Sequence, residues 1–186
     1  MAVSADPTAT SVLPSGMNAR LVRGEGTGKS LVEVDKVELA KELLSRASQK
    51  RVSIELPVDH VIAAGLDSSE FEVVPVDQTP ADCMGLDIGP ETVLRYSQII
   101  RRAKTIVWNG PMGVFENPKF AQGTFGVARA VAEANAFSII GGGDSAAAVA
   151  QSGMESKITH ISTGGGASLE FLSGQKLPGV EVLTNK

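Results

Sequence analysis

One short design occurs twice in this chain and constrains its fold more than any other feature. The segments SIIGGGDSAAAV (138–149) and HISTGGGASLEF (160–171) share the order apolar strand, three glycines, serine and helix. In an open α/β fold, parallel strands end at one edge of the sheet, where ligands bind. We therefore expect both glycine corners to lie at the same rim of one sheet and to converge on one ligand.

Helix and strand patterns alternate along most of the chain. Apolar periodicity and turn signals predict helices over 34–49, 91–103, 119–134, 145–151 and 168–172. Short apolar runs predict strands over 51–56, 59–64, 71–76, 105–110, 136–140 and 157–162, with a loop and turn over 85–90. The alternation predicts an α/β fold with a three-layer, mostly parallel Rossmann-like sheet and helices on both faces.

Length and composition suit a single domain. The chain has 186 residues, a formal net charge of −4 and one cysteine, Cys83. This charge gives no basic field for nucleic acid or an acidic membrane surface, so neither partner is expected. No apolar run reaches the roughly 18 residues that a membrane span needs. A lone cysteine cannot close a disulfide within the chain, which is typical of the reducing cytosol, so a cytoplasmic location is expected.

Residues 1–27 show the least apolar periodicity and are predicted to form an irregular or disordered lead-in. The segment RGEGTGKS (23–30) is similar to a phosphate-binding P-loop, but that motif needs a glycine where Arg23 stands. A P-loop is therefore not expected, and the folded unit is placed at 28–186.

The first glycine corner suits a phosphate chain. Its glycines, 141–143, leave the backbone open to close approach. Asp144 and Ser145 follow where a helix begins, and a helix N-terminus offers unpaired N–H groups and a partial positive charge. An aspartate repels bare phosphate unless it binds Mg²⁺, so Asp144 is assigned to the metal and Ser145 to phosphate. The alternative is a tight glycine turn in which Asp144 only caps the helix.

The second corner, residues 162–168, offers three glycines but no aspartate. It suits a phosphoryl group whose metal comes from the first corner.

A third element is WNGPMGVFE (108–116), in which an apolar strand ends in a turn. Glu116, beyond this turn, suits a hydrogen bond from a ribose hydroxyl, as acidic residues do in other nucleotide folds. The alternative is a solvated surface carboxylate. Trp108 and His160 lie in apolar strand patterns and are expected to have structural roles, Trp108 in the core and His160 buried with a hydrogen-bond partner.

Taken together, these motifs resemble those of the phosphoglycerate kinase family. The stretches that carry the resemblance occur in family order and cover about residues 28–186: GKSLVE (28–33), LPVD (56–59), MGLDIGPET (84–92), TIVWNGPMGVFE (105–116), SIIGGGDSAAAV (138–149), HISTGGGASLEFL (160–172) and LPGV (177–180).

The resemblance implies a two-domain kinase whose carboxy-terminal domain binds MgADP or MgATP and whose amino-terminal domain binds 3-phosphoglycerate. It implies that this chain binds the nucleotide phosphates and the metal through Gly142, Gly143, Asp144 and Ser145, with Asp144 as the metal residue. It implies that Glu116 meets the ribose and that the adenine pocket is lined by Gly85, Gly110 and Met112. The catalytic glycines near the transferring phosphoryl group would be Gly143, Gly164, Gly165 and Gly166.

Two parts of the family pattern have no counterpart here: the substrate domain, and the first strands of the nucleotide domain. The sheet is therefore expected to be incomplete at its N-terminal strands. A partner such as 3-phosphoglycerate or 1,3-bisphosphoglycerate is expected only if the missing domain is supplied. The resemblance predicts a phosphoglycerate kinase in which this chain supplies the MgADP/MgATP site. The alternative is a truncated, catalytically inactive nucleotide-binding module.

Overall fold

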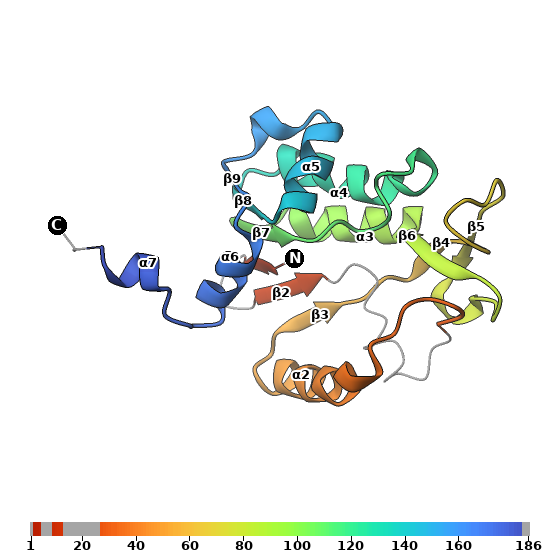
Figure 1. Ribbon diagram of the computed structural model, residues 1–186, viewed down its shortest axis with the longest axis horizontal. Coiled ribbons are helices and arrows are strands. Elements are labelled where there is room, and N and C mark those ends of the chain that lie inside the picture. Colours follow the sequence, from red (N-terminus) through yellow and green to blue (C-terminus); the bar gives the residue numbers. More distant parts are fainter. Residues whose placement is uncertain (1, 5–8, 13–26, 184–186) are drawn as a thin grey trace.

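A computed structural model describes residues 2–4, 9–12 and 27–183 (Figure 1). Within these residues, a six-stranded sheet has the order β3-β2-β1-β7-β8-β9. Its strands are β1 (Ala2–Ser4), β2 (Ala9–Val12), β3 (Ser53–Glu55), β7 (Thr105–Asn109), β8 (Phe137–Gly141) and β9 (His160–Ser162). The pairs β2–β3, β7–β8 and β8–β9 are parallel, whereas β1 runs antiparallel to both β2 and β7. The sheet is thus mostly parallel, as predicted.

The two strands nearest the chain start were not predicted. Ala2–Ser4 and Ala9–Val12 pair with each other and fill the positions between β3 and β7. The expectation of an irregular lead-in is therefore wrong for these two segments, because backbone pairing with neighbouring strands on both sides orders a chain of weak periodicity. The rest of that lead-in, residues 1, 5–8 and 13–26, lies outside the described residues.

A second, smaller sheet is antiparallel, with the order β5-β4-β6. Its strands are β4 (Asp59–Ala63), β5 (Glu72–Pro75) and β6 (Met84–Ile88). The loop predicted over 85–90 is therefore wrong for most of its length. Gly85 and Asp87 are poor strand formers, but pairing with β4, whose five residues are all buried, overrides that local preference.

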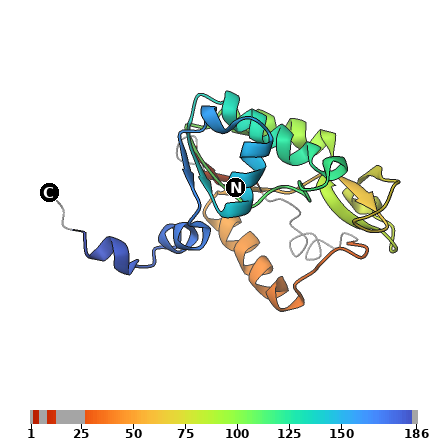
Figure 2. The same ribbon diagram turned by 45° about the horizontal axis from the view of Figure 1, so that its top comes forward.

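Helices cover both faces of the large sheet, which confirms the three-layer α/β fold. The α-helices are α2 (Val37–Gln49), α3 (Pro90–Ile100), α4 (Gln122–Glu133), α5 (Gly143–Gln151), α6 (Gly165–Leu172) and α7 (Pro178–Glu181). Short 3-10 helices occur at Val34–Lys36, Val76–Gln78, Pro118–Phe120 and Glu155–Lys157. Figures 1 and 2 show α3, α4 and α5 on one face and α2 and α6 on the other, while α7 extends away from the body.

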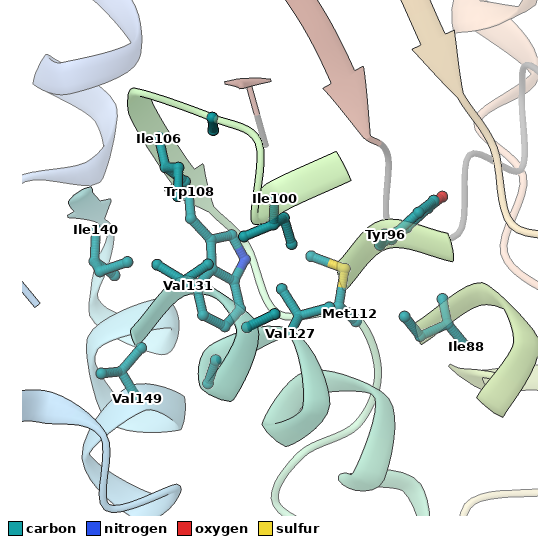
Figure 3. Packing of buried hydrophobic residues seen from close by; sticks show 13 residues of the cluster. Ile88, Tyr96, Ile100, Ile106, Trp108, Met112, Val127, Val131, Ile140 and Val149 are labelled. Carbon is teal, nitrogen blue, oxygen red and sulfur yellow. The ribbon is translucent and has the colours of Figure 1, made fainter. Parts of the chain in front are cut away.

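The main core lies between the large sheet and α3 and α4 (Figure 3). Trp108 is fully buried at its centre, as predicted, and packs among aliphatic side chains that include Ile100, Val131 and Ile140. Burying each such side chain contributes about 1.5–3 kcal/mol. His160 is exposed, so its predicted burial is wrong. The reason is that β9 stands at the edge of the sheet and pairs only with β8 among the described strands.

The small sheet is joined to α3 by a buried carboxylate. Asp59 of β4 accepts hydrogen bonds from the backbone N–H groups of Glu91 (2.9 Å) and Thr92 (2.8 Å) and from the Thr92 hydroxyl (2.5 Å). It thereby caps a helix whose own N-cap, Gly89, has no side chain. A Cβ atom at Gly89 would collide with the Asp59 carboxylate.

Replacing Gly89 with alanine tests this packing. We expect Gly89→Ala to lower the free energy of unfolding by about 1–3 kcal/mol, because Asp59 must leave the N–H groups that it caps. Urea denaturation measures the change. Gly65→Ala is the control, since a Cβ atom there meets nothing within 4 Å and should change stability by less than about 0.5 kcal/mol. Equal effects of the two substitutions would contradict the cap.

Candidate functional site

The two glycine corners lie in direct contact. The Gly142 N–H donates to the Ser162 carbonyl at 2.9 Å, and a Cβ atom at Gly165 would lie only 2.7 Å from Gly142 Cα. Parallel pairing produces this contact, because Gly141 at the end of β8 is in register with Ser162 at the end of β9. The predicted meeting of the corners at one rim is therefore confirmed.

Each corner leads directly into a helix. At the first, Gly142 has a φ of +99°, which favours glycine, and the Ala146 N–H makes the first i→i−4 bond, to the Gly142 carbonyl. The N–H groups of Gly143, Asp144 and Ser145 therefore have no acceptor within the helix. At the second, the Ser168 N–H bonds to the Gly164 carbonyl, so the Gly166 and Ala167 amides belong to the same unpaired first turn. Two helix N-termini at one rim favour an anion.

Asn109 joins these corners, although it was not among the residues expected to form the site. It ends β7 in register with Gly141. Its Nδ2 atom lies 3.2, 3.5 and 3.4 Å from the positions of added Cβ atoms at Gly141, Gly142 and Gly165. The Asn-Gly-Pro sequence predicted only a turn, so it did not indicate that the Asn109 side chain lies between the two glycine corners. The signal that could have found Asn109 is its place as the last residue of a strand neighbouring a glycine corner.

Gly110 forms a third corner, held by side chains from two elements. It has a φ of +87°; its N–H donates to Ser145 Oγ at 2.7 Å, and its carbonyl accepts from Trp108 Nε1 at 2.6 Å. The Ser145 side chain is only 1% exposed. The Ser145 hydroxyl therefore holds the Gly110 corner as an acceptor, and the expected contact of Ser145 with a phosphate stays a prediction.

The segment from Gly110 to Glu116 runs from the rim to the small sheet. The Val114 N–H donates to the Leu86 carbonyl at 2.9 Å, which places the segment beside Gly85 on β6. Glu116 is exposed, as a ribose contact requires. The Met112 side chain is 4% exposed and belongs to the main core, so its expected contact with adenine stays a prediction.

A hollow of about 430 Å³ adjoins the corners on the side of α6. Asn109, Gly141 and Gly164 form one end, and most of the lining is apolar, including Ile139, Phe171 and Leu172. Gly85, Gly110 and Glu116 do not line it. The hollow is therefore the gap between the sheet and α6, distinct from the pocket expected for adenine.

The first corner offers one carboxylate for a metal ion. Asp144 is exposed in the first turn of α5, and the described residues contain no group of three or more acidic, histidine or cysteine side chains placed to hold a metal ion. Mg²⁺ commonly keeps water and substrate phosphates as ligands and takes only one or two carboxylates from the protein. A single exposed aspartate beside unpaired amides fits a magnesium ion that arrives with a polyphosphate.

The segment similar to a P-loop, whose described part is residues 27–30, has another role. Ser30 Oγ accepts the Gly85 N–H at 3.0 Å, and Gly28 has a φ of +55° and lies against the Cys83 carbonyl. No helix of the described chain begins at Lys29 or Ser30, since the next, a 3-10 turn, begins at Val34. The segment supports β6, in agreement with the exclusion of a P-loop.

Comparison with known proteins assigns the family. The model of the phosphoglycerate kinase family matches residues 16–175. The chain belongs to the phosphoglycerate kinase family. This match also includes residues 16–27, which were expected to precede the folded unit.

Curated phosphoglycerate kinases match nearly the whole chain. The protein from Pelotomaculum thermopropionicum is 51% identical over 180 residues, and that from Clostridium novyi is 54% identical over 180 residues. These matches cover 95% of this chain but only 46% and 45% of the two relatives. The chain thus spans less than half the length of these phosphoglycerate kinases.

Solved structures agree. The phosphoglycerate kinase from Coxiella burnetii superimposes with a TM-score of 0.89 at 38% identity, over 94% of this chain and 46% of that one. The phosphoglycerate kinase from Pyrococcus horikoshii superimposes with a TM-score of 0.77 at 36% identity, over 89% of this chain and 42% of that one.

No helix among the described residues is long and apolar enough to cross a bilayer.

Beneath the Gly110–Glu116 segment lies a buried carboxylate, Asp87. It accepts the N–H groups of Gly123 (2.6 Å) and Ile88 (2.9 Å) and is 3% exposed. Burial raises the pKa of Asp87 from 3.8 to about 7, and the two N–H bonds offset only part of this effect.

We expect this carboxyl to make stability depend on pH. Because Asp87 keeps its proton to higher pH when folded, the folded state binds more protons between about pH 4 and 7. Stability should therefore fall as the pH rises through this window, by up to about 4 kcal/mol from this group, and level off above it. Urea denaturation at pH 5 and 8 should show a smaller difference for Asp87→Asn than for wild type. The exposed Asp82→Asn is the control, and an unchanged difference in Asp87→Asn would contradict the assignment.

Proposed function

We propose that this chain supplies the MgADP/MgATP site of a phosphoglycerate kinase. The observation that carries the proposal is the contact between two glycine corners, each opening into a helix N-terminus, at one rim of the sheet. The reaction is reversible phosphoryl transfer between 1,3-bisphosphoglycerate and ADP, giving 3-phosphoglycerate and ATP. Family membership and the site's geometry support the same assignment.

The first corner is proposed to hold the nucleotide phosphates. Gly142 and Gly143 present backbone without side chains. The amides of Gly143, Asp144 and Ser145 lie in the first turn of α5, where they have no acceptor within the helix and are available to phosphate oxygens. Asp144 would share the magnesium ion with the phosphates. When bound, that ion neutralises charge on the phosphate oxygens.

The second corner is proposed to lie near the phosphoryl group that transfers. Gly164, Gly165 and Gly166 add a second helix start in contact with the first corner, and Asn109 adds an amide between them. Phosphoryl transfer needs chiefly positioning and stabilisation of charge, which backbone amides of two helix starts provide. Gly165 acts through the absence of a side chain, since a Cβ atom there would push the corners apart.

Glu116 and the backbone around Gly85 and Gly110 are proposed to hold the nucleoside. Glu116 is exposed at the end of a segment that begins at the rim, so its carboxylate is available to ribose hydroxyls. A cytoplasmic location suits a glycolytic kinase and is part of the same proposal.

The acyl-phosphate site is proposed to come from the part of the family's fold that this chain does not span. With 46% of a relative's length matched, the specific alternative is a nucleotide-binding module without catalysis. A coupled assay on the purified chain with MgADP and 1,3-bisphosphoglycerate separates the two. We expect turnover only when a polypeptide carrying the remaining half is added, and turnover by neither mixture favours the inactive module.

Asp144 gives the sharpest test of the nucleotide site. Because Asp144→Asn keeps the shape but removes the charge that holds magnesium, we expect MgADP affinity to fall roughly tenfold or more. Affinity for ADP without magnesium should change little. Isothermal titration calorimetry with and without EDTA measures both, and the exposed Asp82→Asn is the matched control. Equal MgADP binding by wild type and Asp144→Asn would remove Asp144 from the metal role.

A further inference from the structure

Thr124, in the first turn of α4, holds the segment that carries Glu116. Its side chain is fully buried, and its Oγ1 atom accepts the N–H groups of both Met112 and Gly113, each at 3.1 Å. One hydroxyl thus satisfies two successive backbone donors of the Gly110–Glu116 segment. Buried N–H groups that lose their acceptor are costly, so this pairing fixes the path of the segment.

The small sheet holds the same segment from the other side. The Val114 N–H donates to the Leu86 carbonyl at 2.9 Å, and Gly113 lies so close to Asp87 that a Cβ atom there would collide with it. Asp87 also accepts the Gly123 N–H at 2.6 Å, which fixes the turn of α4 that carries Thr124. Three successive amides, from residues 112 to 114, are therefore held between α4 and β6.

This arrangement determines where Glu116 can reach. Phe115 is 6% exposed and packs with Ala121 and with Ala148 of α5. Ala148 lies four residues after Asp144, on the same face of α5 and one turn from its start. The exposed Glu116 thus directly follows a residue that packs against α5, the helix whose start is proposed to bind phosphate.

We propose that Thr124 is a positioning residue for nucleoside recognition, which fixes the 112–114 backbone so that Glu116 meets the ribose hydroxyls. The inference rests on the proposed nucleotide-binding function. Thr124 itself touches no nucleotide, because its side chain is fully buried. Its effect is on ribose recognition, so substitution of Thr124 should not change the affinity for nucleotides that lack the ribose hydroxyls.

Two substitutions separate the hydroxyl from the packing. Thr124→Val keeps the shape but removes the acceptor, whereas Thr124→Ser keeps the acceptor and removes a methyl group. Hydrogen exchange on folded protein should show the Met112 and Gly113 amides exchanging about tenfold faster or more in Thr124→Val, with protection largely restored in Thr124→Ser. Unchanged exchange in Thr124→Val would overturn the proposal. If Thr124→Val does not fold, Thr124→Cys, which keeps a weak acceptor, replaces it and should give an intermediate increase.

The functional test compares MgADP with magnesium 2′,3′-dideoxy-ADP by calorimetry. We expect wild type and Thr124→Ser to prefer ADP by about tenfold, as one charged hydrogen bond allows, and Thr124→Val and Glu116→Gln to lose most of that preference. A merely structural role of Thr124 would weaken both ligands equally and leave the preference intact, which would overturn the proposal alone. If wild type binds neither ligand, the proposed function fails and this inference fails with it.

Discussion

The level ending of three parallel strands is the constraint on which the site depends. Asn109, Gly141 and Ser162 are the last residues of β7, β8 and β9, and the pairing register places them side by side. The segments that follow these strands therefore begin side by side at one edge of the sheet. Two of these segments are glycine corners that lead into helices. Antiparallel pairing or a shift of one residue would separate the corners or turn their faces apart. Packing of the main core beneath β7 and β8 holds this register.

Two buried side chains, those of Trp108 and Ser145, hold the Gly110 corner in place. Trp108 fills the centre of the core and also donates its indole N–H to Gly110, so core packing and the geometry of the rim are coupled through one residue. Ser145 couples α5 to the same corner through the Gly110 N–H. Since the side chains of Trp108 and Ser145 are almost fully buried, they hold the Gly110 corner from within the protein.

Sequence patterns predicted what depends on local chemistry. The glycine corners, the helices that follow them and the apolar strands were predictable because glycine freedom and apolar periodicity act over a few residues. Features that depend on distant pairing were not. The strand at Met84–Ile88 forms against β4, and strands β1 and β2 form against the large sheet, despite weak local signals. The burial of His160 was mispredicted for a similar reason, because burial depends on neighbours that the sequence does not name. The role of Asn109 depends on its closeness to both glycine corners, which only the folded chain brings together.

The central claim is that the paired corners bind a metal-bound polyphosphate through backbone amides, and amide chemical shifts report on those atoms directly. In ¹H–¹⁵N correlation spectra of the labelled chain, addition of MgADP should shift the amides of residues 142–145 and 164–167 most, with smaller changes in α2 and α7. Saturable shifts confined to these corners, and reduced when magnesium is chelated, are the predicted result. Spectra in which both corners stay unchanged at saturating MgADP, or in which the changes fall on other elements, would contradict the account.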